Sequence, residues 1–294
     1  MSNRNLLPNA SQRPLVLVLG ASGNLGSEVL SRLADQDVRI RCLVRRPIAL
    51  PPGAELVIGS LTEPAQLRAA LNGVDRIFLI WPLLDSTAAA RALEEIALTT
   101  ARVVYLSSTA IDDALPRQSD PIAQVHADLE ALLSRFRLKA VVLRSDTLAS
   151  NARGWRSQLR ISDLVAGPRA AATAVVDERD VAAAAVAILL SDGDSSQPNT
   201  PYLLTGPEIL SRADQLAQLG SVLDRKLRFQ LLDAESARAQ LLADGRPQQL
   251  VEALIEAATN RPDSTLLTDD LSQLTGRAAR TFRAWALDHA AEFS

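Results

Sequence analysis

Residues 15–26 read LVLVLGASGNLG, an unbroken apolar run that ends in a glycine-rich turn. Such a run is typical of a strand that is buried on both faces of a parallel sheet. Residues 24–34 follow with apolar side chains at helical spacing, namely Leu25, Val29, Leu30 and Leu33. The order of strand, glycine turn and helix is the pattern that opens a dinucleotide-binding unit.

The turn itself has three glycines at G-x-x-G-x-x-G spacing. We assign Gly20 to the tight turn, Gly23 to close approach of a pyrophosphate, and Gly26 to close packing of the helix on the strand. The positive end of the helix that starts near Asn24 would hold the diphosphate. The predicted cofactor-binding loop therefore consists of Gly20, Ser22, Gly23, Asn24, Leu25 and Gly26.

The end of the second predicted strand, CLVRRP at 42–47, indicates which dinucleotide is bound. NAD-binding domains usually place a carboxylate there for the ribose 2′-hydroxyl, whereas NADP-binding domains place an arginine for the 2′-phosphate. Here Arg45 can fork onto a phosphate, and Arg46 can stack on adenine or share the charge. The alternative is a pair of solvated surface arginines. The residues favour NADP(H) as the cofactor.

Apolar runs and helical patterns alternate through the first half of the chain. This alternation predicts parallel βαβ units, with helices on both faces of the sheet. The fold class is therefore α/β, a doubly wound Rossmann-type parallel sheet formed by residues 1–150. The expected strands are 15–19, 38–44, 54–58, 76–80, 102–106 and 140–144, and the expected helices are 24–34, 63–71, 86–100 and 121–136.

After residue 144 the alternation stops. Residues 174–205 are expected to return to the sheet, with strands at 174–176 and 202–204, a helix at 177–190 and a loop at 192–201. Residues 151–173 and 206–294 are expected to form a smaller, mainly helical C-terminal lobe that roofs the strand ends. Its expected helices are 147–161, 211–223, 234–244, 248–259 and 276–291.

Composition excludes several classes of function. The net charge is −3 with both signs mixed along the chain, which gives no electrostatic footprint for nucleic acid or an anionic membrane. The apolar runs are too short to span a bilayer, and residues 1–12 read as a loose leader without a signal peptide, so we expect a cytoplasmic protein. The single cysteine, Cys42, excludes a disulfide framework, and the two histidines suggest no metal site.

The chain resembles the NmrA-like branch of the atypical short-chain dehydrogenase/reductases over nearly its whole length. That branch includes NADPH-dependent quinone oxidoreductases and redox-sensing regulators without enzymatic activity. The matching stretches are GASGNLG at 20–26, LVRRP at 43–47, GVDRIFL at 73–79, VVYLSS at 103–108, HADLE at 126–130, LRSDTLASN at 143–151, VVDERDVA at 175–182, YLLTGPEIL at 202–210 and LTGRAARTF at 274–282.

The resemblance implies where the cofactor and substrate lie. Ile80, Trp81 and Pro82 would line the cofactor path, and Ser107 and Ser108 would lie near the nicotinamide. The C-terminal lobe would close a substrate pocket bordered by residues 144–151. A homodimer through the helices expected at 86–100 and 121–136 is possible, as such helices pair in relatives. The pocket residues expected on these grounds are Trp81, Thr109, Asn151 and Trp155.

The sequence departs from ordinary short-chain dehydrogenases at the catalytic acid. Those enzymes use Tyr-x-x-x-Lys, in which the lysine lowers the tyrosine pKa. Counting back from Glu130, the lysine position holds His126 and the tyrosine position holds Ile122. Hydride transfer could proceed to an acceptor that needs little proton donation, or His126 supplies the proton, since its ordinary pKa is close to neutral.

We therefore select His126 and Ser108 as catalytic candidates. The bland alternatives stay open: a half-buried histidine in the pocket wall, serines that end a strand for turn reasons, and tryptophans that serve only as core. The predicted function is an NADPH-dependent reductase of a quinone, an enone or a similar small conjugated carbonyl. Two other functions stay open, a non-catalytic NADP(H)-sensing regulator that docks to a partner and a non-redox isomerase or cyclase.

Overall fold

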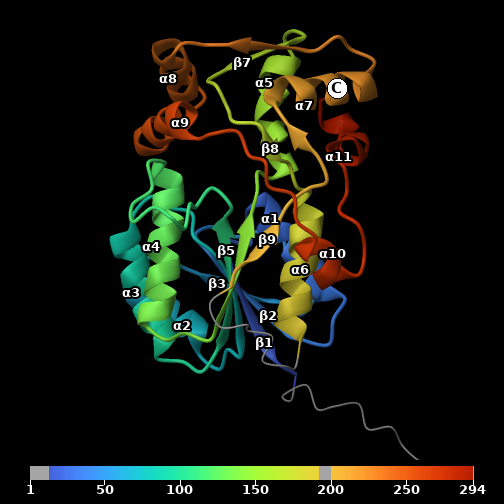
Figure 1. Cartoon of the computed structure of the whole chain (residues 1–294). Coiled ribbons are helices and arrows are strands. Elements are labelled where there is room, and N and C mark those ends of the chain that lie inside the picture. Colours follow the sequence, from blue (N-terminus) through green and yellow to red (C-terminus); the bar gives the residue numbers. More distant parts are fainter. Residues whose placement is uncertain (1–12, 192–199, 294) are drawn as a thin grey trace, which may run out of the picture.

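The computed structural model describes residues 13–191 and 200–293, so the leader expected at 1–12 and most of the loop expected at 192–201 lie outside the described residues. Seven parallel strands form one sheet in the order β3-β2-β1-β4-β5-β6-β9 (Figure 1). The strands are β1 (Leu15–Leu19), β2 (Arg39–Val44), β3 (Glu55–Ile58), β4 (Arg76–Ile80), β5 (Arg102–Ser108), β6 (Ala140–Ser145) and β9 (Tyr202–Leu204). The predicted return of the chain to the sheet at 202–204 is confirmed by the pairing of β9 with β6.

Helices cover both faces of this sheet. On one side of Figure 1 lie α2, α3 and α4, and on the other lie α1, α6 and α10. Their bounds are α1 (Asn24–Ala34), α2 (Pro64–Leu71), α3 (Ser86–Ala97), α4 (Pro121–Arg135), α6 (Glu178–Leu190) and α10 (Asp270–Thr275). The predicted doubly wound α/β class is confirmed.

The first strand shows how the sequence produces two apolar layers. Successive side chains of a strand point to opposite faces of the sheet. Leu15, Leu17 and Leu19 therefore pack into the cluster under α2 and α3, while Val16 and Val18 pack into the cluster under α1 and α6. All five are buried, and each such side chain contributes about 1.5–3 kcal/mol through removal from water. The continuous apolar run is required because both faces are covered.

The position of the site follows from the strand order. The chain moves from β1 outward to β2 and β3, then crosses back to β4 on the other side of β1. At such a switch point the connections leave β1 and β4 in opposite directions, which opens a crevice at their carboxyl ends. The glycine turn and residues 80–82 lie at this end of the sheet.

A separate apolar cluster lies in the region above the carboxyl ends of the strands (Figure 1). Its largest fully buried member is Trp285, which packs against Phe282 and Phe293. The helices of this region are α5 (Arg156–Leu159), α7 (Arg212–Leu223), α8 (Ala234–Ala243), α9 (Gln248–Asn260) and α11 (Phe282–Asp288). Two small sheets join them, one of β7 (Leu164–Gly167) with β11 (Arg228–Leu231) and one of β8 (Thr173–Ala174) with β10 (Ile209–Leu210). We call this region the lobe.

The structure differs from the sequence prediction at two helices. The helix expected at 147–161 is instead a β-bridge at Leu148, a 3-10 segment (Ala149–Trp155) and the short α5, because Leu148 pairs with Val176. The helix expected at 276–291 is shorter: α11 begins after its N-cap Thr281 and is followed by a 3-10 turn (Ala290–Phe293), while Gly276, at φ +71°, ends α10. Strands β7, β10 and β11 and helix α10 were not predicted. Leu271 of α10 packs into the core cluster with α1 and α6, although it falls in the range assigned to the lobe.

Among the described residues, no helix is long and apolar enough to cross a membrane. The same part of the chain has no group of three histidine, cysteine or acidic residues placed to hold a metal ion.

Candidate active site

The glycine turn has the shape that a bound pyrophosphate needs. Gly20 has φ +101°, which L side chains rarely adopt, and a Cβ there would lie 3.0 Å from the Cβ of Ile80. A Cβ on Gly26 would lie 2.1 Å from the carbonyl oxygen of Gly20, so only glycine permits α1 to pack this closely on the turn. Gly23 is exposed, and a Cβ on it would meet only the Gly20 carbonyl oxygen, at 3.5 Å. Its outer side is open to a ligand.

The N-terminus of α1 is suited to an anion. Gly23 is the N-cap and offers no side chain to the free backbone N–H groups, and the first turn contains no acidic residue. Free N–H groups and the helix dipole together favour a negatively charged ligand. Ser22 and Asn24 are exposed beside them, while Leu25 is buried and anchors the helix to the core. Of the six residues predicted for the cofactor loop, Ser22, Gly23 and Asn24 are exposed at the helix N-terminus, while Leu25 and Gly26 are buried and hold the helix against the turn.

Two cations stand at the carboxyl end of β2. Arg45 and Arg46 are exposed, and neither forms a hydrogen bond or ion pair with any described residue. Arg41 on the same strand differs, since it pairs with Glu55 at 2.6 Å. The arginine pair is thus free to receive a 2′-phosphate.

The last residue of β4 and the two residues after it have different environments. Ile80 packs beside Gly20, and Pro82 is exposed. Trp81 is only 6% exposed and lies in the apolar cluster under α2 and α3, because the alternation of β4 puts it on the same face as Leu79 and Ile77. Trp81 was predicted to line the substrate pocket, but it does not line the cavity between the sheet and the lobe.

A cavity of about 1050 Å³ lies between the carboxyl ends of β5 and β6 and the lobe. The sheet contributes the end of β5, the loop that follows it and residues 145–148, and α4 contributes Ile122 and His126. The lobe contributes Trp155, Arg212 and the segment 261–266, among others. The structure brings six predicted site residues to this cavity: Ser107, Ser108, Thr109, His126, Asn151 and Trp155.

His126 is held by a tyrosine. The hydroxyl of Tyr105 lies 2.7 Å from Nδ1 of His126. Burial, and then the charge of Glu130, raise the pKa of Tyr105 well above its ordinary value, so the phenol keeps its proton. We assign the phenol as the donor to Nδ1, which leaves the imidazole proton on Nε2.

The protonation state of His126 differs from the sequence-based expectation. Burial lowers its pKa to about 4, and the nearby charges of Glu130 and Asp120 oppose this only in part. The ring is therefore neutral at neutral pH. It can donate a hydrogen bond from Nε2, but it is not an imidazolium acid with a pKa close to neutral.

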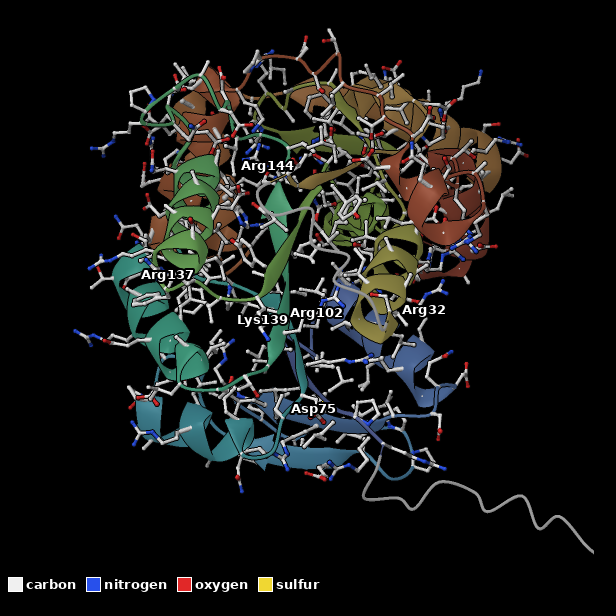
Figure 2. All side chains as sticks on the ribbon, turned by 60° about the horizontal axis from the view of Figure 1, so that its bottom comes forward. Arg32, Asp75, Arg102, Arg137, Lys139 and Arg144 are labelled. Carbon is white, nitrogen blue, oxygen red and sulfur yellow. The ribbon has the colours of Figure 1, made fainter. Side chains whose placement is uncertain are left out.

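Ser107 belongs to a chain of polar groups at the end of β5. Its hydroxyl donates to Glu130 at 2.5 Å, and Glu130 accepts from Arg144 at 2.8 Å and 3.0 Å. Arg144 also binds Asp113 through two hydrogen bonds of 2.7 Å. Burial alone would lower the pKa of Arg144, but its bonds to Asp113 and Glu130 raise it, so the guanidinium stays charged. Figure 2 places Arg144 at this end of the sheet, with Lys139 toward the other.

Ser108 has a different role from its neighbour. Its hydroxyl oxygen accepts from the backbone N–H of Ala110 at 3.1 Å, and its proton has no described acceptor. The proton of Ser107 is committed to Glu130, so Ser108 is the better donor to a substrate oxygen.

Sequence reasoning did not assign Tyr105 or Glu130 to the site. Two spacings contain the missing signal. Tyr105 and Ser107 are two apart on a strand, so they share one face, and His126 and Glu130 are four apart on a helix, so they share one face too. The two pairs meet because α4 packs against β5.

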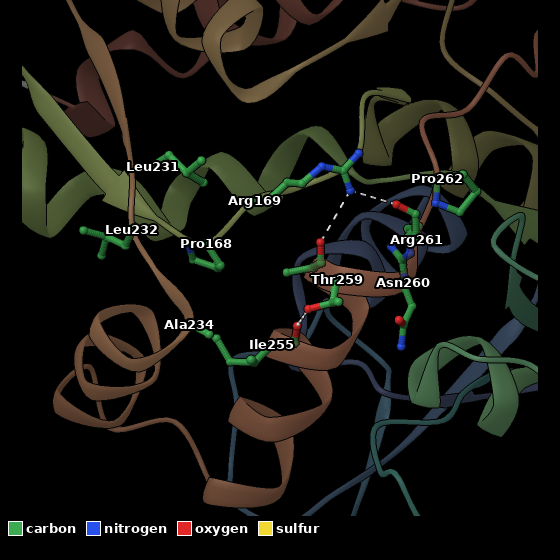
Figure 3. A pocket seen from close by; sticks show the side chains of 11 residues that line it. Pro168, Arg169, Leu231, Leu232, Ala234, Ile255, Thr259, Asn260, Arg261 and Pro262 are labelled. Atoms are coloured by element: carbon green, nitrogen blue, oxygen red, sulfur yellow. Dashed lines mark hydrogen bonds between the residues drawn. The ribbon is translucent and has the colours of Figure 1, made fainter.

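A second cavity of about 480 Å³ is lined by α8, α9 and residues 168–169 (Figure 3). Arg169 lines both cavities. It donates to the carbonyl oxygens of Ala258 and Arg261 and pairs with Asp263 at 3.0 Å. This arginine therefore fastens the lobe and is already occupied.

A family profile described as NAD(P)H-binding matches residues 20–192. A curated relative from Streptomyces griseus, (4-alkanoyl-5-oxo-2,5-dihydrofuran-3-yl)methyl phosphate reductase, is 35% identical over 95% of this chain and 99% of its own. The NAD(P)H azoreductase of Xenophilus azovorans is 29% identical over 95% and 99% of the two chains.

Among solved structures, a NADPH-dependent quinone oxidoreductase from Escherichia coli superposes with a TM-score of 0.75 and 22% identity, over 95% of this chain and 100% of that one. At 22% identity this match shows only that the two chains share a fold. The relative that is 35% identical over nearly the whole chain shows the family. The chain belongs to the NAD(P)H-binding family that this profile describes, and both curated relatives are reductases.

Proposed function

We propose that the chain is an NADPH-dependent reductase of a small conjugated carbonyl, such as an enone or a quinone. The observation that carries this proposal is the large cavity at the carboxyl ends of β5 and β6, at the same end of the sheet as the glycine turn, with His126 and Ser108 among its lining residues. The relative from Streptomyces griseus supports the substrate class, because its name describes a ring double bond conjugated to carbonyl groups.

The cofactor residues are those of the turn and of β2. The N–H groups around Gly23 bind the pyrophosphate, and Arg45 and Arg46 bind the 2′-phosphate that distinguishes NADPH from NADH. When bound, the dinucleotide supplies the hydride.

The chain's own residues act on the substrate oxygen. Reduction of a conjugated carbonyl places negative charge on that oxygen, and hydrogen-bond donors aimed at it lower the barrier. His126 donates a hydrogen bond from Nε2 as a neutral ring held by Tyr105, and Ser108 donates one from its hydroxyl. A proton from water completes the reduction. Because a conjugated acceptor spreads the charge over several atoms, two neutral donors suffice where a simple ketone would need a stronger acid.

The test is an acceptor panel at constant NADPH, with the loss of absorbance of NADPH as the readout. We expect turnover with an α,β-unsaturated lactone and with 1,4-benzoquinone, and none with the saturated lactone. NADPH deuterated at C4 should transfer its label to carbon of the reduced lactone. Tight NADPH binding without turnover of any conjugated acceptor would contradict the proposal.

A further inference from the structure

The lobe side of the large cavity has two arginines without a carboxylate partner. Arg212 is the first residue of α7, and Arg246 lies between α8 and α9. Both line the cavity, and neither side chain forms a hydrogen bond or ion pair with any residue of the described chain. The other arginines of the same wall are paired, Arg169 with Asp263 and Arg261 with Asp120. Because the other arginines of this wall are paired, the two unpaired guanidinium groups indicate a binding site for an anionic ligand.

The two guanidinium groups converge on one place. The Cζ atom of Arg212 lies 5.5 Å from the ring centroid of Trp155. The Nη2 atom of Arg246 lies 3.6 Å from the point that a Cβ on Gly154 would occupy. Because Gly154 and Trp155 are consecutive, the two cations flank the same short stretch of the cavity wall. Trp155 makes a cation–π contact with Arg212, which orients the guanidinium group without neutralising its charge.

The electrostatics at this place are unfavourable without a ligand. Burial lowers the pKa of Arg212, and the positive charge of Arg246 lowers it further. Like charges this close repel each other, and among the described residues no carboxylate forms an ion pair with either. A dianion bound between them would remove the repulsion and accept hydrogen bonds from both guanidinium groups.

We propose that Arg212 and Arg246 form a subsite for a phosphate monoester of the substrate. This rests on the proposed function, because the conjugated carbonyl would face His126 on the sheet side while the phosphate would face the lobe. A phosphate monoester carries close to two negative charges and three acceptor oxygens, which matches two forked donors better than a carboxylate does. The relative that is 35% identical is named as the reductase of a methyl phosphate ester, which is consistent with such a substrate.

The experiment measures binding separately from turnover. Protein saturated with NADP⁺ is titrated by calorimetry with phenyl phosphate, phenol and benzoate. We expect phenyl phosphate to bind well above phenol and benzoate. Arg246→Gln and Arg212→Gln should each weaken its binding at least about tenfold, as expected for loss of a charged hydrogen bond. Arg246→Lys should retain part of the affinity.

The controls separate this subsite from folding and from the cofactor site. Arg160→Gln changes an exposed arginine of the same lobe that does not line the cavity, and it should leave binding unchanged. Arg246 is exposed in a turn, so its variants test the subsite even if Arg212→Gln disturbs α7. Binding of phenyl phosphate no tighter than phenol, binding equal to benzoate, or binding insensitive to both arginine variants would overturn the subsite.

A second readout connects the subsite to catalysis. With a phosphorylated unsaturated lactone, Arg246→Gln should raise KM at least about tenfold and leave kcat within a few-fold. With the unphosphorylated lactone, the variant should match the parent protein. If no acceptor is reduced at all, the proposed reductase fails while the calorimetric result on the subsite still stands. If reduction is found but phosphate has no effect on KM, the subsite fails and the reductase stands.

Discussion

The two sides of the large cavity differ in how their polar groups are satisfied. On the sheet side, Ser107, Glu130 and Arg144 are bonded to one another, and Tyr105 fixes the ring of His126. On the lobe side, Arg212 and Arg246 have no partner among the described residues. The sheet side is therefore organised before a substrate arrives, as catalytic donors must be. On the lobe side, the positive charges of the two arginines are not neutralised by protein groups and are available to a ligand.

The largest expected effect concerns stability on the sheet side. Glu130→Gln removes one of the two carboxylate partners of the buried Arg144, together with the charged acceptor of Ser107, and should lower the free energy of unfolding by about 2–3 kcal/mol. The matched control is Glu252→Gln, which breaks a pair with Arg238 in which both side chains are exposed and should cost much less. Urea denaturation measures both.

The same measurement tests the lobe side. Arg246→Gln removes a repulsion rather than a partner, so its stability should equal or slightly exceed that of the parent. A loss comparable to that of Glu130→Gln would show that the two sides do not differ in the way described.

A second prediction concerns the cofactor surface. The double change Arg45→Ser and Arg46→Ser should weaken NADPH binding about tenfold to a hundredfold, because a charged hydrogen bond to the 2′-phosphate contributes about 1.5–3 kcal/mol. NADH binding should be unchanged, which is the internal control. Equal losses for both dinucleotides would mean that the arginines serve the fold instead.

A third prediction follows from the lowered pKa of His126. The unfolded chain takes up a proton at this histidine near pH 6.5, whereas the folded chain does so only near pH 4. The free energy of unfolding should therefore fall as the pH drops from about 6.5 to about 4. In a His289→Gln background, the ring signals of His126 can be followed alone by NMR. A midpoint near 6.5 in the folded protein would contradict the neutral donor.

The smallest effect is expected at Tyr105. Tyr105→Phe keeps the ring in the core but removes the bond to Nδ1, so His126 loses its fixed tautomer. We expect kcat to fall several-fold to about tenfold with little change in KM. This is the opposite of the pattern expected for Arg246→Gln. A change in KM alone would contradict the role of Tyr105 in positioning His126.

Local sequence patterns were sufficient for the Rossmann half because its signals are local. The apolar run of β1 and the glycine turn each follow from neighbouring residues. In the lobe, β7 pairs with β11 across more than sixty residues of chain, and neither strand has a clear pattern of its own. The helix expected at 147–161 failed for the same reason, since the distant Val176 pairs with Leu148.

The candidate site divides in the same way. His126, Ser108 and the glycines were selected from motifs, and the structure places the first two in the wall of the large cavity. Trp81 was placed in the pocket, although its position two residues after Leu79 on β4 puts it on the buried face. The pairing of Arg212 with Arg246 is a juxtaposition that only the fold of the lobe produces.

A single-turnover experiment tests most directly whether the sheet side of the cavity performs the chemistry and the lobe side binds the substrate. NADPH-loaded protein is mixed with a phosphorylated unsaturated lactone, and the loss of NADPH absorbance is followed for the parent, Ser108→Ala and Arg246→Gln. We predict a slower saturating rate for Ser108→Ala, and for Arg246→Gln an unchanged rate reached only at higher substrate concentration. Rates that respond in the reverse way, or NADPH that is never consumed, would contradict the division between a chemical sheet side and a binding lobe side.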